Sequence, residues 1–190
     1  MPTPARTSRE EIIRAARTLL ERGGPESVTM QRVALAVGVR APSLYKHVRN
    51  RSDLVRLVIE DVATDLAATV DRAVSSDDPA ADLQAIAHAF RRFAHANPQA
   101  YGLIFANVPE EWRAAPESLA RANDALLRTT GALAGDGDAL AAARTVVAWA
   151  HGFVSMELAG AFRLGGNVDE AFAFGVERLG AALGALRSGT

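Results

Sequence analysis

Apolar residues recur every three or four positions along nearly the whole chain, and runs that alternate apolar with polar residues, as strands require, do not occur. Alanine, leucine, arginine and glutamate dominate between short stretches rich in glycine, proline, serine and aspartate. The pattern therefore predicts an all-α protein of nine helices.

Capping residues and helix breakers set the boundaries of the first three helices. The first begins after Ser8, which forms a capping box with Glu11, and ends at the glycine pair 23–24. The second begins after Thr29 and stops at Gly38. A very short third helix follows, with a proline near its first turn.

The later boundaries are marked in the same way. We expect a long fourth helix capped by Asn50 and Asp53, followed by a break over residues 75–79. A fifth helix should end at Asn97-Pro98, and a short sixth should lie around Tyr101 to Phe105. The last three helices should be a seventh that starts at Pro116, an eighth of about 25 residues after the break 135–137, and a ninth that starts at Asn167.

The eighth predicted helix is apolar on nearly all sides. Two stripes follow it: Leu140, Val147, His151, Val154, Leu158 and Phe162; and Val146, Trp149, Phe153, Met156 and Gly160. A helix without a polar face must be covered on both sides. The ninth helix repeats apolar residues at heptad-like spacing beside Gly175, Gly180 and Gly184, which allow close approach. The last two helices therefore predict a homodimer joined by a four-helix interface.

Length and composition exclude several classes of protein. The chain has 190 residues, 49% hydrophobic and 23% charged, which suits one good core or two small helical domains that share one. The absence of cysteine excludes a disulfide framework, thiolate metal sites and cysteine nucleophiles. The N-terminal segment has no apolar stretch, and no run approaches the roughly 18 residues of a membrane span. We expect a cytoplasmic protein.

Charge is distributed unevenly along the chain. Residues 1–60 carry 11 basic and 6 acidic side chains, whereas residues 61–190 carry 10 basic and 16 acidic ones. A basic head on an acidic body is typical of a chain that presents one end to a polyanion.

Residues 29–48 have the sharpest local pattern, which is a capped helix, a glycine turn and a second short helix. Ala34 is small where the two helices would cross, Gly38 permits the turn, and Leu44 anchors the second helix. The outward positions of that helix hold small, basic or hydroxyl-bearing side chains: Ala41, Ser43, Tyr45, Lys46 and His47. Such groups suit a major groove and its phosphates, so this segment predicts a helix-turn-helix.

Several pieces match a known family. They are Ile12-(x)2-Ala15-Ala16, Val28-Thr29, Val33-Ala34, Gly38-Val39 and, above all, Leu44-Tyr45-Lys46-His47-Val48 followed by Asp53-Leu54. Through them, residues 8–60 resemble the DNA-binding domain of the tetracycline-repressor (TetR) family of bacterial transcription regulators. The stretch 149–152, Trp-Ala-His-Gly, resembles the Trp-x-His-Gly signature in the C-terminal domain of one subfamily. One departure is that Arg40 and Ala41 stand where many members carry a capping serine.

The resemblance implies a nine-helix TetR-like fold, with a helix-turn-helix domain over residues 1–53 and a ligand-binding and dimerisation domain over 54–190. It further implies a regulator, by family habit a repressor, that binds a palindromic operator in double-stranded DNA as a homodimer. A small apolar effector would release it, and no cofactor is expected.

The resemblance also implies which residues contact DNA: Thr29, Gln31, Arg40, Ala41, Pro42, Ser43, Tyr45, Lys46, His47 and Arg51. The first two lie near phosphates, and the glutamine also reaches a base edge. Arg40 and the three residues after it enter the major groove, where the arginine addresses guanine. Tyr45 and His47 bond phosphates, while Lys46 and Arg51 add charge.

Aromatic residues gather in the fifth to eighth helices, where charges are few. We expect these residues, with a histidine as hydrogen-bonding group, to line an effector pocket: Phe90, Phe93, Tyr101, Phe105, Trp112, Trp149, His151, Phe153 and Met156. Because aromatics at helical spacing also form plain core, a DNA-binding regulator without a small-molecule effector is the alternative. An enclosed cavity in the C-terminal domain would favour the effector.

A small helical enzyme is a further alternative, which the residues disfavour. His47, His88, His95 and His151 form no His-x-x-x-His or Glu-x-x-His pair. Ser155 has no glycine-framed nucleophile elbow, and no phosphate-cradling glycine loop is present. The sequence therefore predicts neither catalytic nor metal-binding residues.

Overall fold

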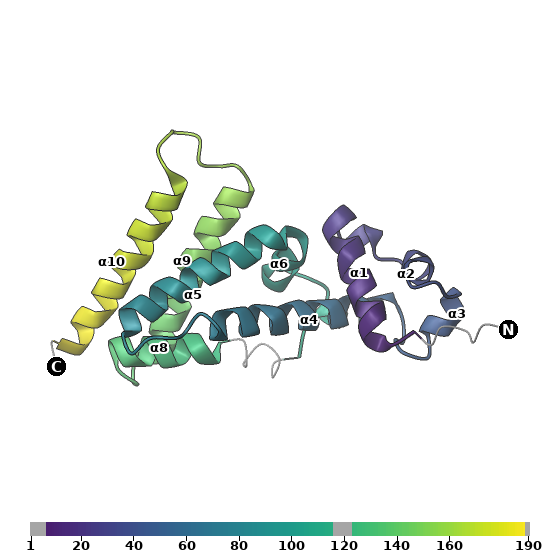
Figure 1. Ribbon diagram of the computed structural model, residues 1–190, viewed down its shortest axis with the longest axis horizontal. Helices are drawn as coiled ribbons and strands as arrows, with labels where there is room; N and C mark the ends of the chain where they lie inside the picture. Colours follow the sequence, from purple (N-terminus) through teal and green to yellow (C-terminus); the bar gives the residue numbers. More distant parts are fainter. Residues whose placement is uncertain (1–6, 116–122, 189–190) are drawn as a thin grey trace. The chain divides into compact units, whose positions relative to one another are not determined.

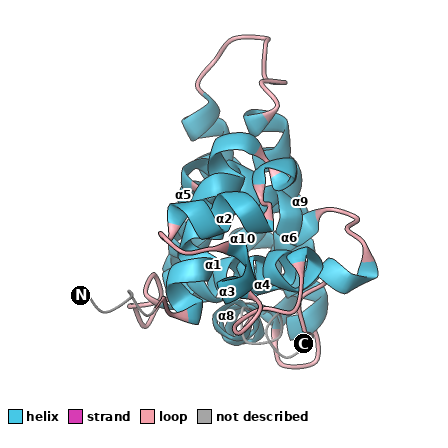
Figure 2. Cartoon of the chain, turned by 90° about the vertical axis from the view of Figure 1, so that its right-hand side faces the viewer, coloured by secondary structure: helices cyan, strands magenta, loops and turns pink. Residues whose placement is uncertain are grey.

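The computed structural model describes residues 7–115 and 123–188, and within these ranges it contains helices and connecting segments but no strand (Figure 1, Figure 2). Nine α-helices occur in the described ranges: α1 (Arg9–Gly23), α2 (Met30–Ala36), α3 (Ala41–Leu44), α4 (Arg51–Asp71), α5 (Pro79–Ala96), α6 (Pro98–Phe105), α8 (Asp124–Ala134), α9 (Ala139–Leu158) and α10 (Val168–Ser188). The predicted all-α fold class is confirmed. Two short 3₁₀ helices, η1 (Pro25–Ser27) and η2 (Glu110–Trp112), are additions that the hydrophobic pattern does not predict.

The predicted helix caps are present. The Ser8 hydroxyl accepts a hydrogen bond from the backbone N–H of Glu11 at 3.1 Å, and the Glu11 carboxylate accepts one from the N–H of Ser8 at 2.9 Å. The side chains of Thr29, Asn50 and Asn167 each accept a backbone N–H of the helix that follows, at 3.2, 2.9 and 2.9 Å. Short polar side chains at these positions satisfy the amide groups that a helix leaves unpaired at its start.

Three of the predicted helix boundaries differ from the observed ones or lie outside the described residues. Helix α6 already begins at Pro98, whose fixed φ suits a first helical turn. Helix α9 has 20 residues and ends at Leu158, so the prediction of about 25 was wrong; Gly160, with φ +64°, ends the helix in the manner of a glycine C-cap. The expected start of the seventh helix at Pro116 lies outside the described residues, and α8 begins at Asp124.

The chain folds into two compact units that do not follow chain order. Within the described residues, the first unit contains 7–65 and 97–115, and the second contains 66–96 and 123–188. Helix α4 contributes residues to both units, and α6 belongs to the first. This partition differs from a single boundary between residues 53 and 54, because contacts rather than sequence position define it.

The core of the first unit is formed by the apolar faces of its helices. The side chains at its centre are 0–2% exposed: Ile12, Leu20, Val33, Leu44, Leu54 and, on α6, Tyr101. Residues from four separate helices of the N-terminal segment and from α6 thus share one core. Burial of each large apolar side chain favours folding by about 1.5–3 kcal/mol.

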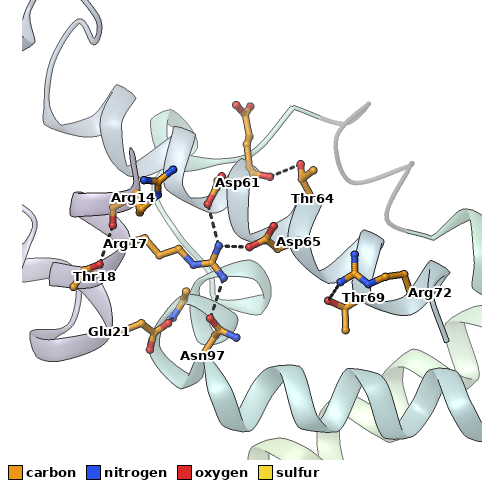
Figure 3. A network of polar contacts seen from close by, with 12 residues as sticks. Arg14, Arg17, Thr18, Glu21, Asp61, Thr64, Asp65, Thr69, Arg72 and Asn97 are labelled. Atoms are coloured by element: carbon orange, nitrogen blue, oxygen red, sulfur yellow. Dashed lines mark hydrogen bonds and ion pairs between the residues drawn. The ribbon is translucent and has the colours of Figure 1, made fainter. Parts of the chain in front are cut away.

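Polar contacts also connect α1, α4 and the start of α6 (Figure 3). The guanidinium of Arg17 donates to the carboxylate of Asp61 at 3.0 Å and to that of Asp65, and it donates to the side-chain oxygen of Asn97 at 2.9 Å. The pKa of Arg17 is raised, because the two carboxylates outweigh the opposing effect of burial.

Glu21, one turn further along α1, caps α6. Its carboxylate accepts hydrogen bonds from the backbone N–H groups of Gln99 and Ala100, at 3.1 and 2.9 Å. Asn97, the N-cap residue of α6, makes no capping bond of its own. An anionic oxygen at a helix N-terminus is stabilised both by the free amide groups and by the helix dipole.

The second unit packs α5, α8, α9 and α10 together. Phe172, Val154 and Leu83 are fully buried in it. Figure 1 shows α9 and α10 as an antiparallel pair joined by the connection 159–167. Gly175 permits their close approach, since a Cβ at that position would lie 2.2 Å from Cζ2 of Trp149.

The α9–α10 pair keeps several large apolar side chains exposed. The exposed fractions are 52% for Leu140, 49% for Met156 and 64% for Phe174, while Leu164 in the connection is fully exposed. The other side of α9 is buried through Val146, Ala150 and Val154. A single chain therefore covers only one side of the apolar helix α9.

Candidate nucleic-acid interface

Helices α2 and α3 form a helix-turn-helix whose turn depends on one glycine. Gly38 has φ +73°, a conformation that glycine adopts without strain. Directly after it, the N–H of Val39 donates to the carbonyl of Ala34 at 2.9 Å, which closes the turn on α2. Leu44 and Val48 are 0% and 2% exposed and anchor the second helix and its continuation. The helix-turn-helix that the sequence predicts is therefore present.

The start of α3 has no side-chain cap. Its N-cap residue is Arg40, in an extended conformation, and no side-chain capping bond is made there. Pro42 instead suits the first turn through its fixed φ. The Arg40 side chain, which makes no capping bond, is exposed to solvent.

Most of the predicted DNA-contacting side chains are accessible. The exposed ones are Gln31, Arg40, Pro42, Tyr45 and Lys46, and the half-buried ones are Thr29, Ala41, Ser43 and His47. The Tyr45 side chain is 56% exposed although tyrosine usually buries much of its ring. They all lie on α2 and α3, at the N-caps of these helices or directly after α3.

Arg51 has a different setting from the other predicted contacts. Its Nε donates to the carbonyl of Val28 at 2.8 Å and its Nη2 to the carbonyl of Pro25 at 2.7 Å. The guanidinium carbon also lies 5.2 Å from the centroid of the Trp112 ring. Its side chain is one-third exposed.

The start of α4 next to this region is held by a charged cluster. Asp53 accepts from the backbone N–H of Arg49 at 2.9 Å and from the guanidinium of Arg56 at 2.8 Å. Burial raises the pKa of Asp53, but these donors more than offset it and lower the pKa to about 2. Asp53 therefore stays ionised and fixes the α3–α4 junction.

The expected effector residues fall into both units. Tyr101, Phe105 and Trp112 belong to the first unit, where the Tyr101 and Phe105 rings lie 5.2 Å apart. Trp112 donates from Nε1 to the Ser52 hydroxyl at 3.3 Å. The remaining six belong to the second unit: Phe90, Phe93, Trp149, His151, Phe153 and Met156.

In the second unit, an aromatic cluster includes two of the predicted residues. The rings of Trp149 and Phe153 lie 5.8 Å apart, and each lies within 5.2 Å of the Phe172 ring. Phe162 lies 4.7 Å from Phe153. Phe172 was not among the predicted effector residues, because the heptad-like spacing of the last helix predicts that it belongs to the dimer interface.

The other predicted residues of this unit differ in burial. Phe90 and Phe93 are buried on α5, whereas Met156 is half exposed. His151 lies 3.4 Å from the hydroxyl of Ser155, and burial lowers the pKa of its imidazole. A mostly neutral imidazole at this place can donate or accept a hydrogen bond.

A polar hollow of about 320 Å³ occurs elsewhere in the second unit and was not predicted. It is lined by His88, Arg91, Arg92, His95, Glu157 and Asp169. Arg91 donates to Glu157 at 2.9 and 2.5 Å and to Asp169 at 2.6 Å, which ties α5 to the end of α9 and the start of α10. Arg91 and, to a smaller extent, His95 lower the pKa of Glu157 to about 2. No local sequence pattern predicts this hollow, because its lining residues come from three segments that are distant in the chain.

Two findings concern other kinds of site. Among the residues that the structure describes, no three histidine, aspartate or glutamate side chains are grouped as metal ligands would be. Within the same ranges, no helix is both long enough and apolar enough to cross a membrane.

Comparison with known proteins agrees with this geometry. Residues 12–58 match the family described as bacterial regulatory proteins, tetR family, and residues 83–179 match the tetracyclin repressor-like C-terminal domain. An uncharacterised HTH-type transcriptional regulator of Mycobacterium tuberculosis is 34% identical over 163 residues, which cover 83% of this chain and 73% of that protein.

Similar solved structures cover nearly the whole chain. A TetR variant from Acinetobacter baumannii in complex with minocycline has a TM-score of 0.70 and 25% identity, covering 96% of this chain and 99% of its own. A protein of unknown function from Rhodococcus has a TM-score of 0.79 at 24% identity, covering 96% and 99%, and shows the shared fold.

Fold, helix-turn-helix and relatives together define a DNA-binding transcriptional regulator, not an enzyme. The chain belongs to the TetR family.

Proposed function

We propose that this regulator binds a palindromic operator as a homodimer, represses transcription there in the cytoplasm, and is released by a small, largely apolar molecule. The observation that carries the proposal is the accessible set of small, basic and hydroxyl-bearing side chains on α2 and α3, displayed by a buried anchor of Leu44 and Val48. Side chains of this kind contact bases and phosphates in a major groove.

The second copy of the chain is proposed to cover the open side of α9 and α10. Leu140, Met156 and Phe174 are large apolar side chains that a single chain leaves about half or more exposed. Exposed apolar patches of this kind mark association surfaces. A two-fold pair of such surfaces gives two recognition helices and hence a palindromic site.

The effector is proposed to contact the aromatic cluster of the second unit. Trp149 and Phe153 are only partly buried, and His151 on the same helix supplies a hydrogen-bonding group. A structural relative at 25% identity is solved in complex with minocycline, which supports a small organic effector for this chain. To release DNA, the effector must bind the released form more tightly than the DNA-bound form.

A two-stage assay tests this function. Duplexes selected by the protein from a randomised pool give the operator, and small molecules found by thermal shift are then tested for operator release. We expect Trp149→Phe and Phe153→Leu to raise the half-maximal effector concentration about tenfold while operator affinity is kept. Trp112→Phe, a matched aromatic substitution in the first unit, should leave the effector response unchanged. An effector response that is unchanged in both second-unit variants contradicts the assigned effector site.

A further inference from the structure

We propose that Arg51 and Trp112 are positioning residues for DNA recognition, in which Trp112 holds Arg51 and Arg51 holds the backbone that enters α2. This assigns Trp112 a role outside the effector site, and it assigns Arg51 a role other than phosphate contact. The inference rests on the proposed DNA contacts of α2 and α3. All of the residues involved belong to the first compact unit.

The first step is the contact between Arg51 and the entry to α2. Its Nε and Nη2 donate to the carbonyls of Val28 and Pro25, at 2.8 and 2.7 Å. Val28 directly precedes Thr29, which caps α2 through a bond to the N–H of Arg32. The guanidinium fork therefore fixes the backbone from which Thr29 and Gln31 project. Two donors in a rigid plane do this better than a single ammonium group.

The second step is the contact between Trp112 and Arg51. The guanidinium carbon lies 5.2 Å from the ring centroid, where the ring attracts a cation. Trp112 is itself held by its Nε1, which donates to the hydroxyl of Ser52 at 3.3 Å. Trp112 therefore contacts two adjacent residues of α4, its ring lying over the guanidinium of Arg51 and its indole N–H donating to Ser52.

The third step is the anchoring of the segment that carries Trp112. Three residues after it, the N–H of Ala115 donates to the carboxylate of Glu60 at 3.1 Å. Glu60 is paired with Arg56 at 2.7 Å on the same helix. The segment from η2 to Ala115 is thus attached to α4 at two points, which hold it next to Arg51.

Charge at position 51 then acts differently from charge at position 46. Arg51 has two carbonyl acceptors, one ring face and an ion pair with the exposed Glu26 at 3.9 Å, whereas the Lys46 side chain is exposed. A phosphate contact contributes to the salt dependence of binding, with a slope of about 0.9 for each phosphate neutralised on duplex DNA. A positioning residue changes affinity without changing that slope.

The test measures affinity and salt slope on a duplex that the wild-type protein selects from a randomised pool. Trp112→Ala and Arg51→Lys should each weaken binding about tenfold with the salt slope unchanged. Trp112→Phe, which keeps the ring over the guanidinium, should restore most of the affinity. The control Lys46→Gln should lower the slope by about 0.9. Wild-type affinity in Trp112→Ala overturns the proposal, as does wild-type affinity in Arg51→Lys combined with a reduced slope in Arg51→Gln.

Amide hydrogen exchange supplies a readout that needs no DNA. Exchange at residues 28–32 should be faster in Trp112→Ala and Arg51→Lys than in the wild type, while Trp112→Phe and Lys46→Gln keep the wild-type rate. Unchanged exchange in the first two variants overturns the positioning role even if their DNA binding is weak. A wild-type protein that selects no duplex contradicts the proposed function instead, so the two failures are distinguishable.

Discussion

Gly175 sets the separation of α10 from α9, because a Cβ there would lie 2.2 Å from Cζ2 of Trp149. We expect Gly175→Ala to lower the free energy of unfolding by about 1–3 kcal/mol, as overpacking does when a ring cannot move aside. Gly102→Ala is the control, since its Cβ would meet no atom within 4 Å and should stabilise α6 slightly. Urea unfolding followed by circular dichroism measures both, and equal effects would contradict the close approach.

Tyr45 and Arg40 are expected to contribute to DNA binding in different ways. Tyr45→Phe removes a charge-assisted phosphate hydrogen bond and should cost about 1.5–3 kcal/mol on every sequence. Arg40→Ala should relax preference at one base pair, because the arginine side chain is exposed at the start of α3 and can address guanine. Binding profiles over a randomised operator library compare the two. A changed preference in Tyr45→Phe with none in Arg40→Ala would reverse these roles.

The contact partners of individual side chains were the feature that the sequence predicted least well. Spacing alone places Leu44 in the core and Tyr45 on the surface, and both placements are observed. Spacing cannot show that Arg51 donates to carbonyls 23 and 26 residues earlier, or that Trp112 covers it. Contacts of this range depend on how the chain folds back, which no local pattern contains.

At the scale of elements, α1 supplies the polar groups that hold α6. Glu21→Gln keeps the shape of the side chain but removes the charge from the first turn of α6, where it accepts two backbone N–H groups. We expect a loss of about 0.5–2 kcal/mol in unfolding free energy, the range for a lost helix cap. Glu10→Gln removes the same charge from an exposed position on α1 and should cost less. Equal losses in chemical denaturation would exclude the cap.

Helices were predicted well and their junctions less well. Caps such as Ser8 with Glu11, and Asn167, act within four residues, so the sequence shows them directly. The length of α9 was overestimated because apolar residues keep their helical spacing past Leu158. The helix nevertheless ends there, since Gly160 adopts a positive φ of +64°. The η1 and η2 turns have too few residues to produce a periodic pattern.

At the scale of the whole molecule, acid should weaken the fold through Glu157. The pKa of its carboxyl is lowered to about 2 in the folded chain, so the group stabilises the fold above its ordinary value of 4.5 and loses this effect as pH falls toward 2. Glu157→Gln should cost at most about 3 kcal/mol at neutral pH, and the two proteins should converge in stability near pH 2. Denaturant titrations across this pH range decide it, and a pH-independent difference would contradict the ionic role.

The open apolar side of α9 could be anticipated from the sequence, but the polar hollow of the second unit could not. The apolar pattern of α9 shows that one chain cannot cover it on all sides, and Leu140, Met156 and Phe174 are indeed exposed on the α9–α10 pair. The hollow lined by Arg91, Glu157 and Asp169 was not anticipated, because charged residues on three separate helices look like ordinary surface positions in sequence.

Sequencing of duplexes selected by the full chain from a randomised pool tests the central claim most directly. If two copies present α3 to successive major grooves, the selected sequences should contain an inverted repeat whose half-site centres lie about 34–36 Å apart, one helical turn of DNA. Selection of a single asymmetric site, or of no sequence in preference to the starting pool, would contradict the account.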